Sequence, residues 1–254
     1  MNPLKTAINT LLRLGNYEVK KLNKIYDYVE LRKNDKELVQ EVINQNLTMT
    51  SPDRLLATLF AVKYVCNSKI DGDFVECGVW RGGNSILAIR LLNQLSNNKS
   101  VWMYDTFKGM TQPTSNDYEN STGRKALDEY ERQNEINHNN WCYSSFDDVK
   151  NNIEPYKQNL TVNMIKGDIV ETLKDNSNVP SSISVLRLDT DWYESTKVEL
   201  EKLYPKLSSG GVLLIDDYGH WGGCKKAVDE FFTKLDKPPL LIPSDYTGRI
   251  AIKV

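Results

Sequence analysis

The sequence predicts an α/β fold, a mostly parallel twisted sheet with helices on both faces, preceded by a helical extension. Two observations lead to this prediction. From residue 71 onward, short apolar segments of strand length alternate with segments whose apolar residues recur at the helical period. In addition, each of the first five apolar segments ends in an acidic residue. Parallel strands present their carboxyl ends at one edge, where such sheets bind ligands, so these acids indicate a site.

Residues 1–70 are expected to form the helical extension. Apolar residues recur at helical spacing between residues 4 and 14, and again between residues 38 and 43. A third helix is expected after Ser51, which can cap it, with Pro52 at the first helical position. Because no Pro- or Gly-rich linker follows, we expect this extension to pack on the core.

Residues 71–254 are expected to form one domain of alternating strands and helices. The expected strands are residues 72–78, 100–107, 161–168, 182–191 and 210–218, and the expected helices are residues 85–95, 194–207 and 225–235. Two further short strands are expected between residues 239 and 254.

A polar, asparagine-rich stretch at residues 108–149 interrupts this alternation directly after the second strand. It contains one candidate helix at residues 123–133. A solvated surface excursion is one interpretation. Both flanks must lie near the strand ends, however, so we favour a lid over the ligand site, at about residues 110–148.

Charge and cysteine usage exclude several classes of protein. The formal net charge of −2 gives no support for nucleic-acid binding. The longest apolar runs are of strand length, which predicts no membrane span, and the first residues do not resemble a signal peptide. The four cysteines form no C-x-x-C pair, and two histidines are too few for a zinc site. We expect separate thiols in a reducing compartment, and hence a cytoplasmic protein.

A glycine-containing stretch, residues 76–85, follows the first strand and begins a helix. Glycine allows sharp bends and close ligand approach, and a helix N-terminus offers free N–H groups to an anion. The spacing is not G-x-G-x-x-G, so a dinucleotide pyrophosphate is not the first choice. A ligand with one carboxylate and one ammonium group fits better, with the carboxylate at the glycine turn and the ammonium at Glu76.

Two further acids extend this prediction to a nucleoside. Asp105 follows Gly83 by about 20 residues, the position that accepts hydrogen bonds from ribose hydroxyls. Asp168, after the third strand, would lie by the adenine, although it is nearly as well explained as a helix cap. Adenosine plus an amino acid is S-adenosylmethionine. The cofactor-binding residues predicted in this region are Glu76, Gly78, Trp80, Gly83, Asn84, Ser85, Asp105, Phe107 and Asp168.

The fourth and fifth strands end in paired acids, Asp189 with Asp191 and Asp216 with Asp217. Adjacent strands lie about 4.8 Å apart, so these carboxylates can converge. Without a cation they would repel one another, and carboxylate oxygens suit magnesium. One acid of the fourth strand can bind the metal while the other takes the proton of an acceptor hydroxyl. Taken alone, the Asp216–Asp217 pair would be better explained as a helix cap with solvated charges.

Four segments together resemble the macrocin O-methyltransferase family, and the resemblance covers most of residues 45–235. They are GDFVECGVWRGGNS, YDTFKGM, LRLDTDWYESTKVELEKLYPKLSSGGVLLIDDY and CKKAVDEFF. The resemblance implies a Rossmann-like class I methyltransferase that uses S-adenosylmethionine and magnesium to methylate a sugar hydroxyl on a glycan or small-molecule natural product. By position it implies the metal ligands Asp189, Asp216 and Asp217 and the general base Asp191. It also implies that residues 48–51, including Met49 and Ser51, cover the methionine end of the cofactor.

Some residues depart from the family pattern or stay ambiguous. Thr190 and Trp192 replace a more usual Gly and Leu, so we expect the pocket wall to differ. Trp192 and Tyr193 could stack on a sugar, but aromatic residues at a helix start more often belong to the core. His220 could assist the acceptor, although a packing role is the safer expectation. A catechol-type O-methyltransferase and a non-catalytic S-adenosylmethionine-binding protein are the alternative functions, and the N-terminal helices could support a homodimer.

Overall fold

A seven-stranded sheet with the order β3-β2-β1-β4-β5-β7-β6 lies at the centre of the computed structural model, which describes residues 28–254. The strands are β1 (Asp73–Cys77), β2 (Val101–Asp105), β3 (Val162–Lys166), β4 (Ile183–Leu188), β5 (Leu207–Ile215), β6 (Ile242–Pro243) and β7 (Arg249–Ile252). The first five are parallel, whereas β7 is antiparallel to β5 and β6. The predicted mostly parallel sheet is confirmed. Strands β1, β2 and β3 follow one another toward one edge of the sheet, and β4 and β5 lie on the other side of β1.

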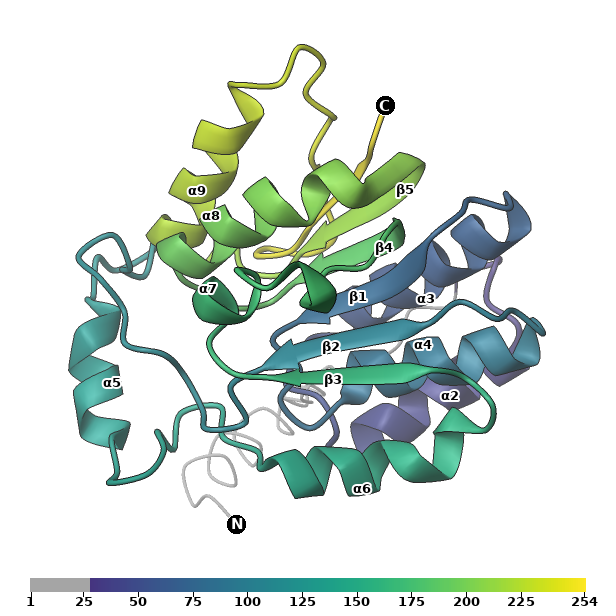
Figure 1. Cartoon of the computed structure of the whole chain (residues 1–254), viewed down its shortest axis with the longest axis horizontal. Helices are drawn as coiled ribbons and strands as arrows, with labels where there is room; N and C mark the ends of the chain where they lie inside the picture. The colour runs from purple at the N-terminus through teal and green to yellow at the C-terminus, as the bar shows by residue number, and fades with distance from the viewer. Residues whose placement is uncertain (1–27) are drawn as a thin grey trace, which may run out of the picture.

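Helices cover both faces of the sheet (Figure 1). One face carries α2 (Lys33–Asn44), α3 (Pro52–Asn67), α4 (Gly83–Gln94) and α6 (Phe146–Lys157), and the other carries α7 (Ile169–Thr172), α8 (Tyr193–Lys202) and α9 (Gly222–Phe232). Successive strand residues alternate between two hydrophobic cores, as Phe74 and Val75 do in β1. Within residues 28–254, no helix is long and apolar enough to cross a membrane.

The helices α2 and α3 share a hydrophobic core with the sheet. Leu38 and Val42 of α2 and Leu55 and Leu59 of α3 are buried in the same cluster as strand residues such as Val185. This extension therefore packs on the sheet through a common core. The helix expected between residues 4 and 14 lies outside the described residues.

Two helices differ from the sequence predictions. The helix expected at residues 194–207 ends at Lys202, and a short 3-10 turn that contains Pro205 leads into β5 at Leu207. The predicted insert ends at residue 149, but α6 already begins at Phe146. Its cap was overlooked, since Ser145 Oγ accepts a hydrogen bond from Asp148 N at 3.1 Å.

The insert between β2 and α6 carries α5 (Ala126–Gln133) and lies beyond the carboxyl ends of the strands (Figure 1). Buried Asp117 anchors it to the core by accepting a hydrogen bond from Tyr193 N at 2.8 Å. Any side chain at Gly223 would collide with this carboxylate, because a Cβ there would lie 1.9 Å from Asp117 Oδ1. The insert is thus fixed against the starts of α8 and α9.

Candidate active site

A cavity of about 230 Å³ opens at the carboxyl ends of β1, β2, β4 and β5, as the sequence predicted for the ligand. It is far larger than the ~10–15 Å³ that one water molecule needs. Residues 47–50 and the insert complete its walls. Among the described residues, seven acids line it and the only Lys, Arg or His in the lining is Arg54. We call the ends of β1–β3 the cofactor half, and the ends of β4 and β5 the acidic half.

Both oxygens of the Asp105 carboxylate, in the cofactor half, accept hydrogen bonds from backbone N–H groups. Its Oδ2 accepts hydrogen bonds from Val79 N at 2.8 Å and Trp80 N at 3.0 Å, and its Oδ1 accepts one from Phe107 N at 2.7 Å. Asp105 therefore fixes the turn between β1 and α4 while it also lines the cavity. Burial raises its pKa, and these hydrogen bonds oppose that shift.

Glu76 lies at the floor of the cavity and is almost completely buried. Ser85 Oγ donates a hydrogen bond to its Oε2, and Arg187 Nη1 lies 3.1 Å from its Oε1. Burial raises the pKa of Glu76 to about 7, although Arg187 and Ser85 act in the opposite direction. A cationic group bound above Glu76 would favour the ionised carboxylate.

Two glycines are required by close backbone approach. Gly78 has a φ of +82°, and a Cβ there would lie 1.8 Å from the carbonyl oxygen of Asp189. A Cβ at Gly83, in the first turn of α4, would lie 2.5 Å from the carbonyl oxygen of Leu47. At these two glycines the turn after β1 and the start of α4 pack directly against the end of β4 and the segment before α3.

Asp168 is placed as the helix-cap interpretation of its sequence position predicted. Its Oδ1 accepts a hydrogen bond from Val170 N at 2.9 Å and so caps the short helix α7. It also lines the cavity at the end of β3. The cap is what the geometry shows, and contact with adenine stays a prediction.

The other predicted cofactor residues divide into two groups. Met49, Trp80 and Asn84 line the cavity together with the glycines. Three residues lie behind the lining: Ser51, which binds Asp245; Ser85, which binds Glu76; and Phe107, which packs on Phe146.

Three carboxylates of the acidic half converge. Ligand oxygens of Asp189, Asp191 and Asp217 lie within 4.8 Å of one another. Asp217 is buried, and its Oδ2 has no hydrogen-bond partner among residues 28–254. Burial and the neighbouring charges of Asp191 and Asp189 raise the pKa of Asp217 well above its usual value. Carboxylates this close repel one another when ionised, and a bound cation would remove that repulsion.

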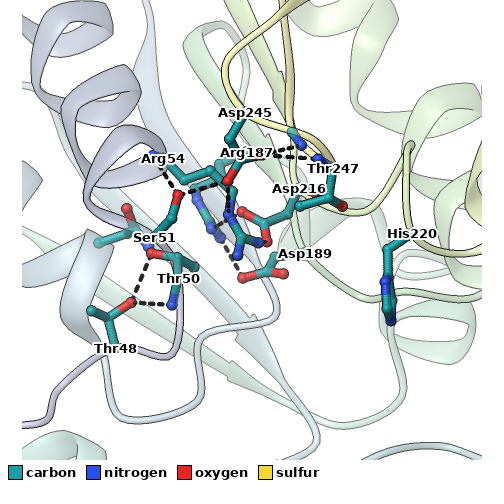
Figure 2. A network of polar contacts seen from close by, with 12 residues as sticks. Thr48, Thr50, Ser51, Arg54, Arg187, Asp189, Asp216, His220, Asp245 and Thr247 are labelled. Carbon is teal, nitrogen blue, oxygen red and sulfur yellow. Dashed lines mark hydrogen bonds and ion pairs between the residues drawn. The ribbon is translucent and has the colours of Figure 1, made fainter. Parts of the chain in front are cut away.

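Asp216, also predicted as a metal ligand, contacts two arginines (Figure 2). Arg187 Nη2 contacts its Oδ1, and Arg54 Nη1 contacts its Oδ2. Both oxygens are therefore already engaged by guanidinium groups, and a metal ligand at Asp216 would have to accept an arginine N–H as well. Burial, followed by the charge of Asp189, raises the pKa of Asp216.

Sequence reasoning missed both arginines. Arg187 is fully buried in β4, and it also lies 2.6 Å from Asp189 Oδ2. Arg54 comes from α3, and its Nε lies 3.1 Å from Asp245 Oδ2, although it is not aligned for a hydrogen bond. One signal was visible for Arg187, because a charged residue interrupts an otherwise apolar buried strand. No local pattern marks Arg54 or Asp245.

The aromatic residues near the acidic half belong to the packing. Trp192 is buried, donates a hydrogen bond to the carbonyl of Thr111 at 2.9 Å, and packs edge to face with Trp141 and Trp221. Neither Trp192 nor Tyr193 lines the cavity. His220 Nδ1 lies 3.1 Å from the hydroxyl of Tyr246, and the ring stands apart from the arginine network (Figure 2). Trp192 therefore joins the insert to the core, as the packing interpretation predicted.

The chain is similar to several characterised methyltransferases. It is 34% identical over 204 residues to the demethyldecarbamoylnovobiocin O-methyltransferase of Streptomyces niveus, covering 79% of this chain and 73% of the relative. It is 34% identical over 187 residues to the 8-demethyl-8-(2,3-dimethoxy-alpha-L-rhamnosyl)-tetracenomycin-C 4'-O-methyltransferase of Streptomyces olivaceus, covering 72% and 67%. The solved structure of the O-methyltransferase NovP matches with a TM-score of 0.71 and 32% identity over 82% of each chain.

The family model for macrocin O-methyltransferases matches residues 3–248, nearly the whole chain. The sheet order, the cavity at the strand ends and the similarity to the relatives agree with this match. The chain belongs to the macrocin O-methyltransferase family and is an S-adenosylmethionine-dependent O-methyltransferase.

Proposed function

We propose that the protein transfers the methyl group of S-adenosylmethionine to a sugar hydroxyl of a glycosylated natural product, with the help of a magnesium ion. The observation that carries the metal-assisted part is the convergence of Asp189, Asp191 and Asp217 around the unpartnered oxygen of Asp217. The sugar is inferred from the relatives, since the name of the Streptomyces olivaceus enzyme includes a rhamnosyl group.

The residues of the cofactor half fit S-adenosylmethionine. The N-terminus of α4, with Gly83 and Asn84 in the lining, suits the methionine carboxylate. Buried Glu76 suits the ammonium group. Asp105 has further lone pairs for ribose hydroxyls beyond those used by the backbone.

The residues of the acidic half fit a hard divalent cation. All three converging groups are carboxylates, which suit magnesium better than zinc or copper. The two arginines already neutralise Asp216 and part of the charge of Asp189. Among residues 28–254, no Lys, Arg or His forms an ion pair within 4.0 Å of Asp191 or Asp217. We assign Asp189 and Asp217 as metal ligands. Asp216, the third ligand expected from the sequence, would bind the cation while its two oxygens also contact Arg54 and Arg187.

The chemistry divides between the bound groups and the chain. When bound, S-adenosylmethionine supplies the methyl group, and the cation lowers the pKa of the acceptor hydroxyl. Asp191 lies beside Asp189 and Asp217, so it is placed to take the proton of an acceptor hydroxyl at this cluster. The walls formed by residues 47–50 and by Met110, Thr111 and Cys142 of the insert hold the two substrates in line and exclude water.

The test is turnover on a panel of acceptors, read as S-adenosylhomocysteine released with magnesium and with a chelator. Glycosylated macrolides, aminocoumarins and anthracycline-like compounds are compared with their aglycones and with free catechols. We expect magnesium-dependent methylation of glycosides only. Turnover of catechols alone would contradict the sugar assignment. Cofactor binding without turnover on any acceptor would support a non-catalytic role.

Two further parts of the proposal concern the setting of the protein. All four cysteines are unpaired thiols, which supports the reducing cytoplasm as its location. A homodimer built on the N-terminal helices is tested by light scattering of the purified full chain.

A further inference from the structure

Thr190 forms a buried hydrogen bond behind the acidic half. Its Oγ1 donates to Oε1 of Glu199 in α8 at 2.8 Å. Glu199 has no exposed surface, and its second oxygen, Oε2, has no hydrogen-bond partner in the described part of the chain. Thr190 lies between Asp189 and Asp191 in sequence and also lines the cavity. The threonine that departs from the usual family glycine therefore has a specific buried partner.

The turn that contains Thr190 holds an unfavourable backbone conformation. Asp191 has a φ of +67°, in the left-handed region that residues with a Cβ rarely adopt. Such a conformation persists only where the surroundings hold it. Two hydrogen bonds hold the carbonyl of Thr190, from Trp192 N at 2.7 Å and from Ser195 Oγ at 3.2 Å. The bond to Glu199 is the third hold on this residue.

The buried carboxylate of Glu199 has no evident benefit for the packing of α8. A carboxyl group with one oxygen unpartnered costs free energy of desolvation, and an apolar side chain of similar volume would avoid that cost. Glu199 forms no ion pair within 4.0 Å among the described residues, and Thr190 is its one side-chain hydrogen-bond partner there. The contact that can justify Glu199 is therefore its bond to the turn.

We propose that the Thr190–Glu199 hydrogen bond is a positioning device that presents Asp189 and Asp191 together toward Asp217. It acts through the turn, since the Glu199 carboxylate lies outside the lining of the cavity. This inference rests on the proposed function, because it assumes that the acidic half binds a divalent cation. It adds a residue from the interior of α8 that fixes the shape of that site.

The experiment measures the affinity of the full chain for Mn²⁺, a paramagnetic substitute for magnesium, by electron paramagnetic resonance of the free ion. Thr190→Val removes the donor and Glu199→Met removes the acceptor, while Thr190→Ser and Glu199→Gln keep them. We expect about tenfold weaker Mn²⁺ binding in the first pair, the effect usual for residues that orient metal ligands, and near-normal binding in the second pair. The double variant Thr190→Val/Glu199→Met should bind no more weakly than either single variant, since both remove one bond.

Three controls decide the interpretation. Affinity for S-adenosylhomocysteine should stay unchanged in all variants, and a parallel loss of that affinity would indicate general damage and overturn the positioning role. Glu199→Met should melt at the same or a higher temperature than the parent, so it carries the test if Thr190→Val folds poorly. If Asp217→Ala loses Mn²⁺ binding while Thr190→Val and Glu199→Met retain it, this inference is wrong and the proposed function stands. If Asp217→Ala also retains it, the proposed metal site itself is wrong.

Discussion

Asp105 at the end of β2 and Asp217 just after β5 lie at the same edge of the sheet, but only the first carboxylate is satisfied by hydrogen bonds. Asp105 accepts three backbone hydrogen bonds, so the chain itself satisfies it. Asp217 has an oxygen with no hydrogen-bond partner among the described residues and lies within a cluster of like charges. An acid that is satisfied by N–H groups shapes a loop, whereas an acid left unsatisfied in a partly buried cluster of carboxylates suits a cation. The backbone therefore satisfies the acid of the cofactor half, whereas the acidic half is where we propose that a cation binds.

The largest effect should come from Asp191→Asn. Removing the proposed base should lower turnover by about 10²–10⁴-fold, because that is the usual contribution of general base catalysis. Affinities for S-adenosylhomocysteine and magnesium should be nearly unchanged. Steady-state kinetics with calorimetry of both ligands measures this split. Normal turnover would exclude Asp191 as the base, and loss of magnesium affinity would make it a metal ligand instead.

Replacing an aspartate by asparagine should lower the free energy of unfolding in the cofactor half but not in the acidic half. Asp105→Asn leaves one carbonyl oxygen to accept three N–H bonds and turns an NH₂ group toward donors. It should lower the free energy of unfolding by about 1–3 kcal/mol. Asp191→Asn in metal-free protein should not destabilise, because it removes a repelled charge. Urea denaturation of both variants in chelator gives the comparison, and equal destabilisation would remove the distinction between the halves.

The pH dependence of stability should reveal the acidic half. Burial and nearby carboxylates raise the pKa of Asp191 to about 7, above its value of ~3.9 in the unfolded chain. The folded state then binds more protons than the unfolded state, so stability falls as pH rises from about 4 to about 7. Glu76 and Glu199, whose pKa values burial raises to about 7 and about 8, add to this slope.

Magnesium should reduce that slope, because a bound cation favours the ionised form of Asp191 but does not contact Glu199. The measurement is the free energy of unfolding by urea at pH 5, 6, 7 and 8, with magnesium and with chelator. Identical slopes in the two series would contradict a cation site at Asp191 and its neighbours.

The smallest effect should come from Asp168→Asn. Asparagine caps helices about as well as aspartate, so the free energy of unfolding should change by less than about 0.5 kcal/mol. If the cap is the main role of Asp168, the affinity for S-adenosylhomocysteine should also change by less than about threefold. A larger loss of affinity, with stability unchanged, would show that the carboxylate contacts the adenine.

The sheet and the position of the site followed from sequence because both depend on local patterns. Strand and helix periods predicted the parallel sheet, and acids at strand ends predicted the cavity at that edge. The helix α6 was missed because its polar sequence continues the composition of the insert. The end of α8 was misplaced because apolar residues continue past Lys202 into a 3-10 turn.

The parts of the site that were not predicted depend on contacts between distant segments. Arg54 of α3 meets Asp216 at the end of β5 and Asp245 in the loop before β7. No period or spacing in the chain relates these positions. The directions of neighbouring side chains could not be predicted either. Asp216 and Asp217 are adjacent, but Asp216 contacts Arg187 whereas Asp217 lies beside Asp189 and Asp191.

The most direct test of the difference between the halves is calorimetric titration of S-adenosylhomocysteine into the full chain, once with magnesium and once with chelator. If the cofactor half binds S-adenosylhomocysteine without a metal, binding should occur in both conditions, with dissociation constants that differ by less than about threefold. Binding only with magnesium would show that the cofactor half depends on the acidic half. No binding in either condition would contradict the account of the cavity as a cofactor site.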